Sequence, residues 1–92
     1  MFLDIVTPEA TLFSGDVDSV AVPGVNGEFE MLNNHAPIVS LLKEGHVKIY
    51  GDINLEEEVE SKFTKGDKRG AWLAINSGTI ELKDNKIIVL AD

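Results

Sequence analysis

The stretch TIELKDNKIIVL, residues 79–90, predicts two strands joined by a tight turn, and it points to an all-β chain. Ile80 and Leu82 alternate with charged residues, which is typical of a strand with one buried face. Asp84-Asn85 is a suitable two-residue hairpin turn, because both residue types tolerate positive φ. The returning run Ile87–Leu90 is apolar on both faces, so we expect it to be a central strand.

The rest of the chain repeats this pattern of short apolar runs between turn residues. The runs are rich in β-branched residues and are bounded by Gly, Pro, Asn and Asp, as strands usually are. Many short strands without a long helix predict a sandwich or a barrel. Gly24 and Gly27 are expected to be turn residues around Val25-Asn26. The other expected strands are Phe2–Val6, Thr11–Phe13, Val17–Val22, Glu28–Leu32, Ile38–Leu42, Val47–Tyr50 and Ala71–Ile75.

The segment Asn54–Thr64 fits two patterns. Apolar residues recur there at every fourth position, and Asn54 with Glu57 could form a capping box, which favours a short helix or helical turn. A Glu58–Lys62 pair would support that helix. Alternation along the same residues also fits one face of a strand. We favour the helical turn, and we expect Thr64–Gly70 to be a loop.

The composition limits the function of the chain. Its 92 residues make one small domain of ordinary globular composition. The absence of cysteine excludes disulfides, thiolate metal sites and a cysteine nucleophile. The net charge of −8 argues against binding nucleic acid and against adsorption to anionic lipid. We expect no signal peptide, and no apolar run approaches the ~18 residues of a membrane helix.

The negative charge is concentrated in the first half of the chain. No Lys or Arg precedes Lys43. The first half is therefore either a surface for a basic partner or a solvated acidic face. Its carboxylates are Asp4, Glu9, Asp16, Asp18, Glu28 and Glu30.

The sequence offers little for catalysis. The two histidines, His35 and His46, lack metal-binding spacing, and no serine stands in a nucleophile motif. The glycines match neither the P-loop motif nor the dinucleotide-binding fingerprint. Glu28 and Glu30 would project from one face of a strand, where exposure is favoured over acid–base work. We therefore expect no catalytic residue, no metal site and no cofactor.

The tripeptide His35-Ala36-Pro37 is expected to form an extended corner, because Pro37 disfavours the helical region for the preceding residue. His35 could fix the corner through a hydrogen bond to neighbouring backbone. It could instead lie at an interface, or act in catalysis with a partner that the sequence does not reveal.

Taken together, several short motifs resemble the epsilon subunit of F-type ATP synthases. Their order and spacing hold across nearly the whole chain, and only the combination is specific. The motifs are Phe2–Glu9, Leu12–Gly15, Val22–Glu30, His35–Val39, Lys43–Ile49, Ser77–Leu82 and Val89–Asp92.

The resemblance implies a flattened β-sandwich of about ten strands in two sheets. It also implies a non-catalytic subunit of the rotary central stalk, on the cytoplasmic face of the bacterial inner membrane. Such a subunit docks on the gamma subunit and rests on the cytoplasmic loops of the c-ring. It helps to transmit rotation between proton flow and ATP synthesis, without inserting into lipid.

The resemblance also assigns roles to individual residues. Those that match gamma-facing positions are Thr7, His35 and Ser40. The c-ring loops typically carry an arginine, which would explain an acidic surface. The residues that match the c-ring contact, with Glu28 foremost, are Gly24, Asn26, Glu28, Glu30 and Met31.

The chain departs from the family pattern in three ways. Typical members continue into two C-terminal helices that can inhibit ATP hydrolysis, so we expect no such inhibition from a chain that stops at Asp92. The connection Asp52–Gly70 is longer than usual. Ser77-Gly78 replaces a Gly-Gly pair, and Asn33-Asn34 replaces a Pro-Gly corner, where Asn can adopt the turn.

Two other functions compete with this interpretation. The chain could be a free-standing β-sandwich binding module, although such modules often display exposed aromatics and Trp72 lies in an apolar run expected in the core. It could also be a small hydrolase that uses His35 with Glu28 or Glu30, although no nucleophile motif supports this.

Overall fold

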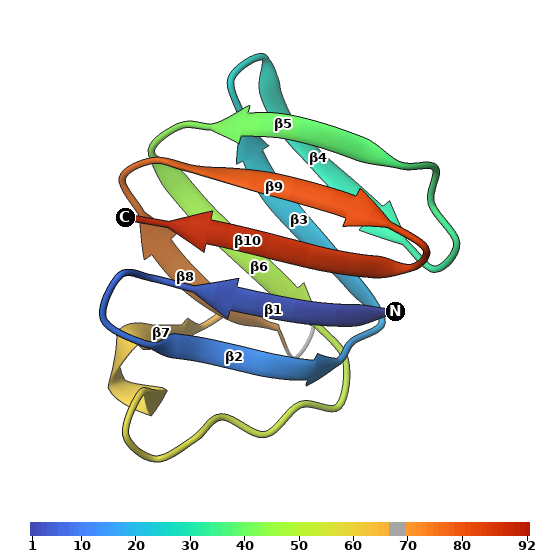
Figure 1. Ribbon diagram of the computed structural model, residues 1–92. Coiled ribbons are helices and arrows are strands. Elements are labelled where there is room, and N and C mark those ends of the chain that lie inside the picture. The colour runs from blue at the N-terminus through green and yellow to red at the C-terminus, as the bar shows by residue number, and fades with distance from the viewer. Residues whose placement is uncertain (67–69) are drawn as a thin grey trace.

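The computed structural model describes residues 1–66 and 70–92, which form an all-β domain (Figure 1). The all-β fold class predicted from the sequence is confirmed, and the number of strands agrees with the about ten that the resemblance implied. The strands are β1 (Phe2–Val6), β2 (Thr11–Asp16), β3 (Ser19–Gly24), β4 (Gly27–Leu32), β5 (Ile38–Leu42), β6 (Gly45–Tyr50), β7 (Phe63–Lys65), β8 (Ala71–Ile75), β9 (Gly78–Lys83) and β10 (Lys86–Ala91). A 3₁₀ turn, η1 (Glu60–Lys62), precedes β7.

The strands form two packed layers that belong to one curled sheet. The hydrogen-bonded order is β2-β1-β10-β9-β5-β3-β6-β8-β7, with β4 on the free side of β3. We call β2, β1, β10, β9 and β5 the front layer, and the remaining strands the back layer (Figure 1). The layers connect through one pair of residues, Leu42 of β5 and Gly24 of β3. The two sheets expected from the resemblance are thus the two halves of one sheet.

The core lies between these layers and follows the alternation of each strand. Side chains from the front layer, such as Ile5, Ile87 and Ile80, are at most 1% exposed. Val20 and Val47 of the back layer are 0% exposed and belong to the same cluster. Burying one such side chain contributes about 1.5–3 kcal/mol. As predicted, β10 is a central strand, between the parallel β1 and the antiparallel β9.

The predicted turns have the backbone geometry that their residues favour. Asp84 and Asn85 have φ of 52° and 62°, which fits a two-residue hairpin with both central residues left-handed. Gly24 pairs with Gly27 across the two-residue turn Val25-Asn26. Gly27 has a φ of 125°, a conformation in which other residues are strained.

The segment before β8 departs from the prediction. A helical turn is present, but η1 is only three residues long and begins after Val59, without a side-chain cap. The predicted cap at Asn54 and the Glu58–Lys62 pair are therefore wrong. The sequence also missed β7, whose residues pair with β8, so Thr64 and Lys65 are strand rather than loop. Residues 67–69 of the predicted loop lie outside the described residues.

This segment is attached to the domain by its two buried apolar residues. Val59 is 7% exposed and Phe63 is 9% exposed, and both join the core cluster. Their spacing of four residues suits a helix, yet Phe63 is already in the extended strand. Packing and pairing with β8 therefore decide the backbone here, rather than helical periodicity. In the described part of the chain, no helix is long and apolar enough to cross a membrane.

Candidate functional site

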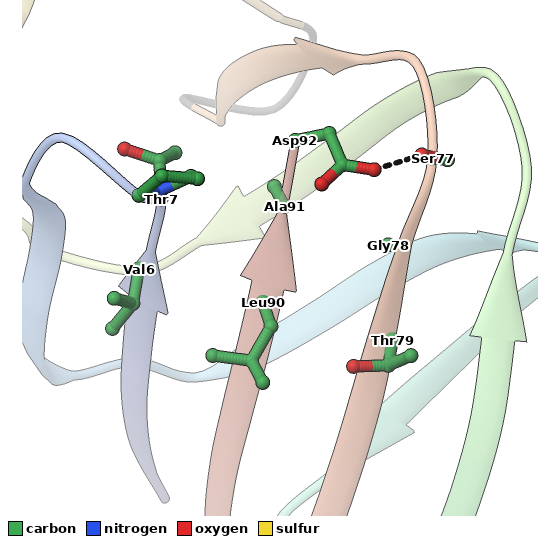
Figure 2. A pocket seen from close by; sticks show the side chains of 9 residues that line it. Val6, Thr7, Ser77, Gly78, Thr79, Leu90, Ala91 and Asp92 are labelled. Atoms are coloured by element: carbon green, nitrogen blue, oxygen red, sulfur yellow. Dashed lines mark hydrogen bonds between the residues drawn. The ribbon is translucent and has the colours of Figure 1, made fainter.

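An exposed apolar patch covers part of the outer face of the front layer. Leu41, Thr79, Leu90 and Val6 are consecutive neighbours across β5, β9, β10 and β1. Val6, Leu90 and Thr79 lie side by side on neighbouring strands (Figure 2). We call this row, together with Val39 in the adjacent row, the front patch.

The front patch is unusual because its large side chains are open to solvent. Val39 is 77% exposed, Leu41 63% and Leu90 52%. Single exposed apolar residues are ordinary, but contiguous ones mark surfaces that meet another macromolecule. The run Ile87–Leu90, which is apolar on both faces, therefore serves two purposes. Ile87 and Val89 fill the core, and Leu90 extends the patch.

Thr7 lies at the end of the front patch, directly after Val6. Its hydroxyl donates to the carbonyl oxygen of Ala10 at 3.1 Å and accepts from the Ala10 N–H at 3.2 Å. These bonds close the turn between β1 and β2. The side chain also lines an open depression of about 470 Å³ beside Leu90 (Figure 2). Across this depression, the Ser77 hydroxyl donates to the Asp92 carboxylate.

His35 lies at the opposite end of the front layer, where β10 begins. Its backbone N–H donates to the Leu32 carbonyl oxygen at 3.1 Å, and its ring Nδ1–H donates to the Ala36 carbonyl oxygen at 2.8 Å. His35 therefore fixes its own corner, as one of the sequence-based alternatives proposed. The residue is also exposed.

An asparagine cluster ties this corner to the turn between β9 and β10. The backbone N–H of Asn34 donates to Asn85 Oδ1 at 2.8 Å, and Asn85 Nδ2 donates to Asn33 Oδ1 at 2.8 Å. Asn34 has a φ of 65°, so it adopts the turn conformation that was predicted for this corner. The sequence did not reveal the link, because Asn85 is 51 positions from Asn34.

Ser40 points to the inner side of β5, and not to the front patch. It is partly buried, whereas its neighbours Val39 and Leu41 are exposed on the other side. Ser40 lines an open groove of about 290 Å³ that also contains the β3–β4 turn and Glu28. The structure thus brings a residue predicted to face gamma next to residues predicted to face the c-ring.

The β3–β4 hairpin places the residues expected at the c-ring on two different sides. Asn26, Glu28 and Glu30 are exposed. Gly24 is buried, and a Cβ there would lie 2.7 Å from the Phe29 ring. Met31 is 0% exposed and belongs to the core.

The burial of Met31 corrects its predicted role. Side chains alternate along β4, so Met31 projects inward when Glu28 and Glu30 project outward. Its side chain is therefore not available to a partner, and we assign it to the core.

The outer face of the back layer is covered by a polar network. Glu28 Oε1 lies 2.9 Å from Lys48 Nζ, and that ammonium lies 4.2 Å from the centre of the Trp72 ring. We call Glu28, Lys48 and Trp72 the back clamp. Next to it, the Ser19 hydroxyl donates to Glu30 Oε2 at 2.7 Å.

Trp72 is half-buried on this outer face, and the prediction that it lies in the core is wrong. Leu73 and Ile75 of β8 point into the core, so Trp72 must point outward. An apolar run alone did not distinguish the two faces. His46 also contacts the indole, with 5.5 Å between ring centroids. Within residues 1–66 and 70–92, no three His, Cys, Asp or Glu side chains are grouped to hold a metal ion.

The family profile and the similar proteins all belong to one family, and the match extends over the whole chain. A family profile described as "ATP synthase, Delta/Epsilon chain, beta-sandwich domain" matches residues 1–92. The ATP synthase epsilon chain of Campylobacter concisus (strain 13826) is 39% identical over all of this chain, which covers 60% of that relative. The ATP synthase epsilon chain of Chlorobaculum tepidum is 38% identical over 98% of this chain, which covers 86% of that relative.

A solved structure shares the fold at low sequence identity. It is titled "Cryo-EM structure of Tetrahymena thermophila mitochondrial ATP synthase - central stalk/cring". The matching chain has a TM-score of 0.73 and 14% identity, over 99% of this chain and 62% of that one. This chain thus spans about 60% of the length of the Campylobacter concisus relative and of that matching chain.

Proposed function

The chain belongs to the delta/epsilon β-sandwich family of ATP synthase subunits, and from this membership we propose that it is a non-catalytic central-stalk subunit that links gamma to the c-ring. The observation that carries the proposal is the family match over residues 1–92. The curated relatives are named as epsilon chains, and the similar fold comes from a structure of a central stalk and c-ring.

In this proposal, the front patch docks on gamma. Val39, Leu41 and Leu90 are exposed on one continuous face, where a partner would remove them from water. Burial of apolar area contributes roughly 25 cal/mol per Å², so covering three such side chains gives a substantial part of an interface. Thr7 borders the patch at one end, and His35 stands at the far end of the same layer.

The tip of the β3–β4 hairpin meets the c-ring in this proposal. Asn26 is exposed at the turn, and Glu28 and Glu30 are exposed on the outer side of β4. Carboxylates opposite a basic loop set register and association rate more than raw affinity. Gly24 supports the tip from within, because the Phe29 ring leaves no room for a side chain there.

The two proposed contacts lie on different layers of the domain. The front patch belongs to β1, β5, β9 and β10, whereas the hairpin tip belongs to β3 and β4. A rigid sandwich between two partners would make them turn together, which is what coupling of proton transport to ATP synthesis requires. We place the chain as a peripheral subunit on the cytoplasmic face of a bacterial inner membrane, since the relatives named above are bacterial.

Affinity capture with separate partners tests this function. The wild-type chain is expected to retain gamma in solution and to bind membranes that contain the c-ring. Glu28→Lys should lose the c-ring and keep gamma, because it reverses a charge on the back layer only. Wild-type chain that captures neither partner would overturn the proposal.

A further inference from the structure

Glu28 already has a cationic partner within the chain. Lys48 Nζ lies 2.9 Å from Glu28 Oε1, and the side chains are 21% and 49% exposed respectively. The pair is neutral in sum, so Glu28 does not present a free negative charge to an approaching cation. Any partner that uses Glu28 must share its carboxylate with Lys48 or displace Lys48 from it.

Lys48 is held in this position by the strands on both sides. It is the pairing partner of Ala21 on β3 and of Trp72 on β8. The small side chain of Ala21 leaves space for the lysine to extend toward β4. On the other side, the ammonium stands 4.2 Å from the centre of the Trp72 ring, within the range of a cation–π contact.

Trp72 is itself packed closely against the connection that precedes β8. A Cβ at Gly66 would lie 1.8 Å from the indole nitrogen, so the backbone closes over that edge of the ring. The indole N–H is buried and has no hydrogen-bond partner among residues 1–66 and 70–92. The face of the ring contacts the Lys48 ammonium, so Trp72 supports that cation with its π electrons.

We propose that Lys48 is a specificity-determining residue, an internal counter-ion that a cationic partner must displace from Glu28. This inference rests on the proposed contact between Glu28 and the c-ring. An arginine meets the requirement best, because its planar guanidinium bonds both carboxylate oxygens at once and is less strongly hydrated than an ammonium. A partner lysine offers only what Lys48 already supplies. The back clamp thereby favours a partner loop with arginine over one with lysine.

Binding to the c-ring of the same organism, reconstituted in nanodiscs, tests the proposal. Glu28→Gln should weaken binding about tenfold. Lys48→Met keeps an unbranched side chain over Trp72 and removes the charge, so it should tighten binding about threefold to tenfold at low salt. This gain should shrink at high salt, because exposed charges are screened. Lys65→Met removes the same charge from β7, at the far edge of the back layer, and should leave the affinity unchanged.

The discrimination itself is measured with an Arg→Lys substitution in the c-ring loop. That substitution should weaken binding to the wild-type chain more than binding to Lys48→Met. If thermal melting shows that Lys48→Met is not folded, Lys48→Gln is used in its place.

The outcomes separate this inference from the function on which it rests. If Glu28→Gln weakens binding but Lys48→Met does not strengthen it, Lys48 is only a structural residue and the inference is wrong. If Glu28→Gln has no effect, the proposed c-ring contact fails as well. If the Arg→Lys substitution in the c-ring weakens binding equally for the wild-type chain and for Lys48→Met, Lys48 does not compete with the partner cation and the inference is wrong.

Discussion

The outer faces of the two layers are built in opposite ways. The front face exposes aliphatic side chains, as the 63% exposure of Leu41 shows. The back face pairs charged side chains within the chain, because Lys48 reaches Glu28 and Ser19 reaches Glu30, although Leu32 is exposed on β4. One sheet thus has an exposed apolar area on one side and, on the other, a polar area where Glu28 and Glu30 already have partners. Substitutions on the front face therefore test the burial of apolar surface, and substitutions on the back face test the exchange of charged partners.

The contrast has a simple origin in the strand sequences. Most residues on both faces of β5 and β10 are apolar, so those that do not enter the core remain exposed outside. The outward residues of β3 are Ser19, Ala21 and Pro23, which are small. Longer side chains from β4 and β6 lie across them, and all three are buried although they face outward. Part of the front face is also polar, since Lys86 lies 4.0 Å from Asp4 near the start of β10.

The largest expected effect comes from a charge placed in the front patch. Leu41→Glu should weaken binding to gamma by about 100-fold, because a carboxylate buried without a partner opposes docking. The free domain should keep its melting temperature, since Leu41 is exposed there. Isothermal titration of gamma and a thermal melt measure the two quantities.

Leu32→Glu is the matched control for this prediction. Leu32 is 59% exposed, but it projects from β4 on the back layer. It should leave gamma binding unchanged. Equal losses from both substitutions would show that the front patch is not the docking surface.

A smaller effect is expected at the corner that holds His35. Asn85→Gly keeps the left-handed turn but removes the bonds to Asn33 and Asn34, and should lower the free energy of unfolding by about 1–2 kcal/mol. Asp84→Gly changes the neighbouring turn residue and breaks no such bond. Chemical denaturation of the two variants separates the hydrogen bonds from the turn itself; a similar stability for both would show that the asparagine cluster contributes nothing.

The hydrogen bond between Ser19 and Glu30 on the back layer is expected to contribute less to stability. Ser19→Ala removes the donor to Glu30 and should destabilise the domain by about 1 kcal/mol, the typical net value of one hydrogen bond. Ser14→Ala on β2 removes an exposed hydroxyl and should be neutral. Urea denaturation compares them, and equal midpoints would mean that the Ser19–Glu30 bond is not formed in solution.

The smallest effect on stability is expected from Lys48→Met. A partly exposed ion pair contributes little, so the free energy of unfolding should change by about 0.5 kcal/mol or less. A loss of several kcal/mol in urea denaturation would indicate that the back clamp is a structural element, in contrast to the role in partner choice that we propose.

The sequence predicted the elements well but not the faces of its apolar residues. Alternation and turn chemistry identified β10 and the Asp84-Asn85 hairpin, because both depend on neighbouring residues. The same alternation cannot say which side of a strand faces the core, so Trp72 was placed inside. Met31 was expected at the c-ring from the resemblance alone, and its side chain lies in the core. Pairing with β8 created β7 from residues that looked like a loop.

The candidate site was partly predictable for the same reason. Glu28 and Glu30 were correctly expected on one side of a strand, since that is a local property. Their partners Lys48 and Ser19 come from other strands, and nothing near Glu28 in the sequence points to them. The front patch was also missed, because it exists only where β5, β9, β10 and β1 lie side by side.

Methyl NMR of the labelled chain with unlabelled gamma tests whether the front patch is the surface that docks on gamma. Gamma should shift or broaden the methyl signals of Val39, Leu41 and Leu90 and leave those of Leu32 unchanged. Perturbation of Leu32 with unchanged signals from the front patch would contradict this expectation.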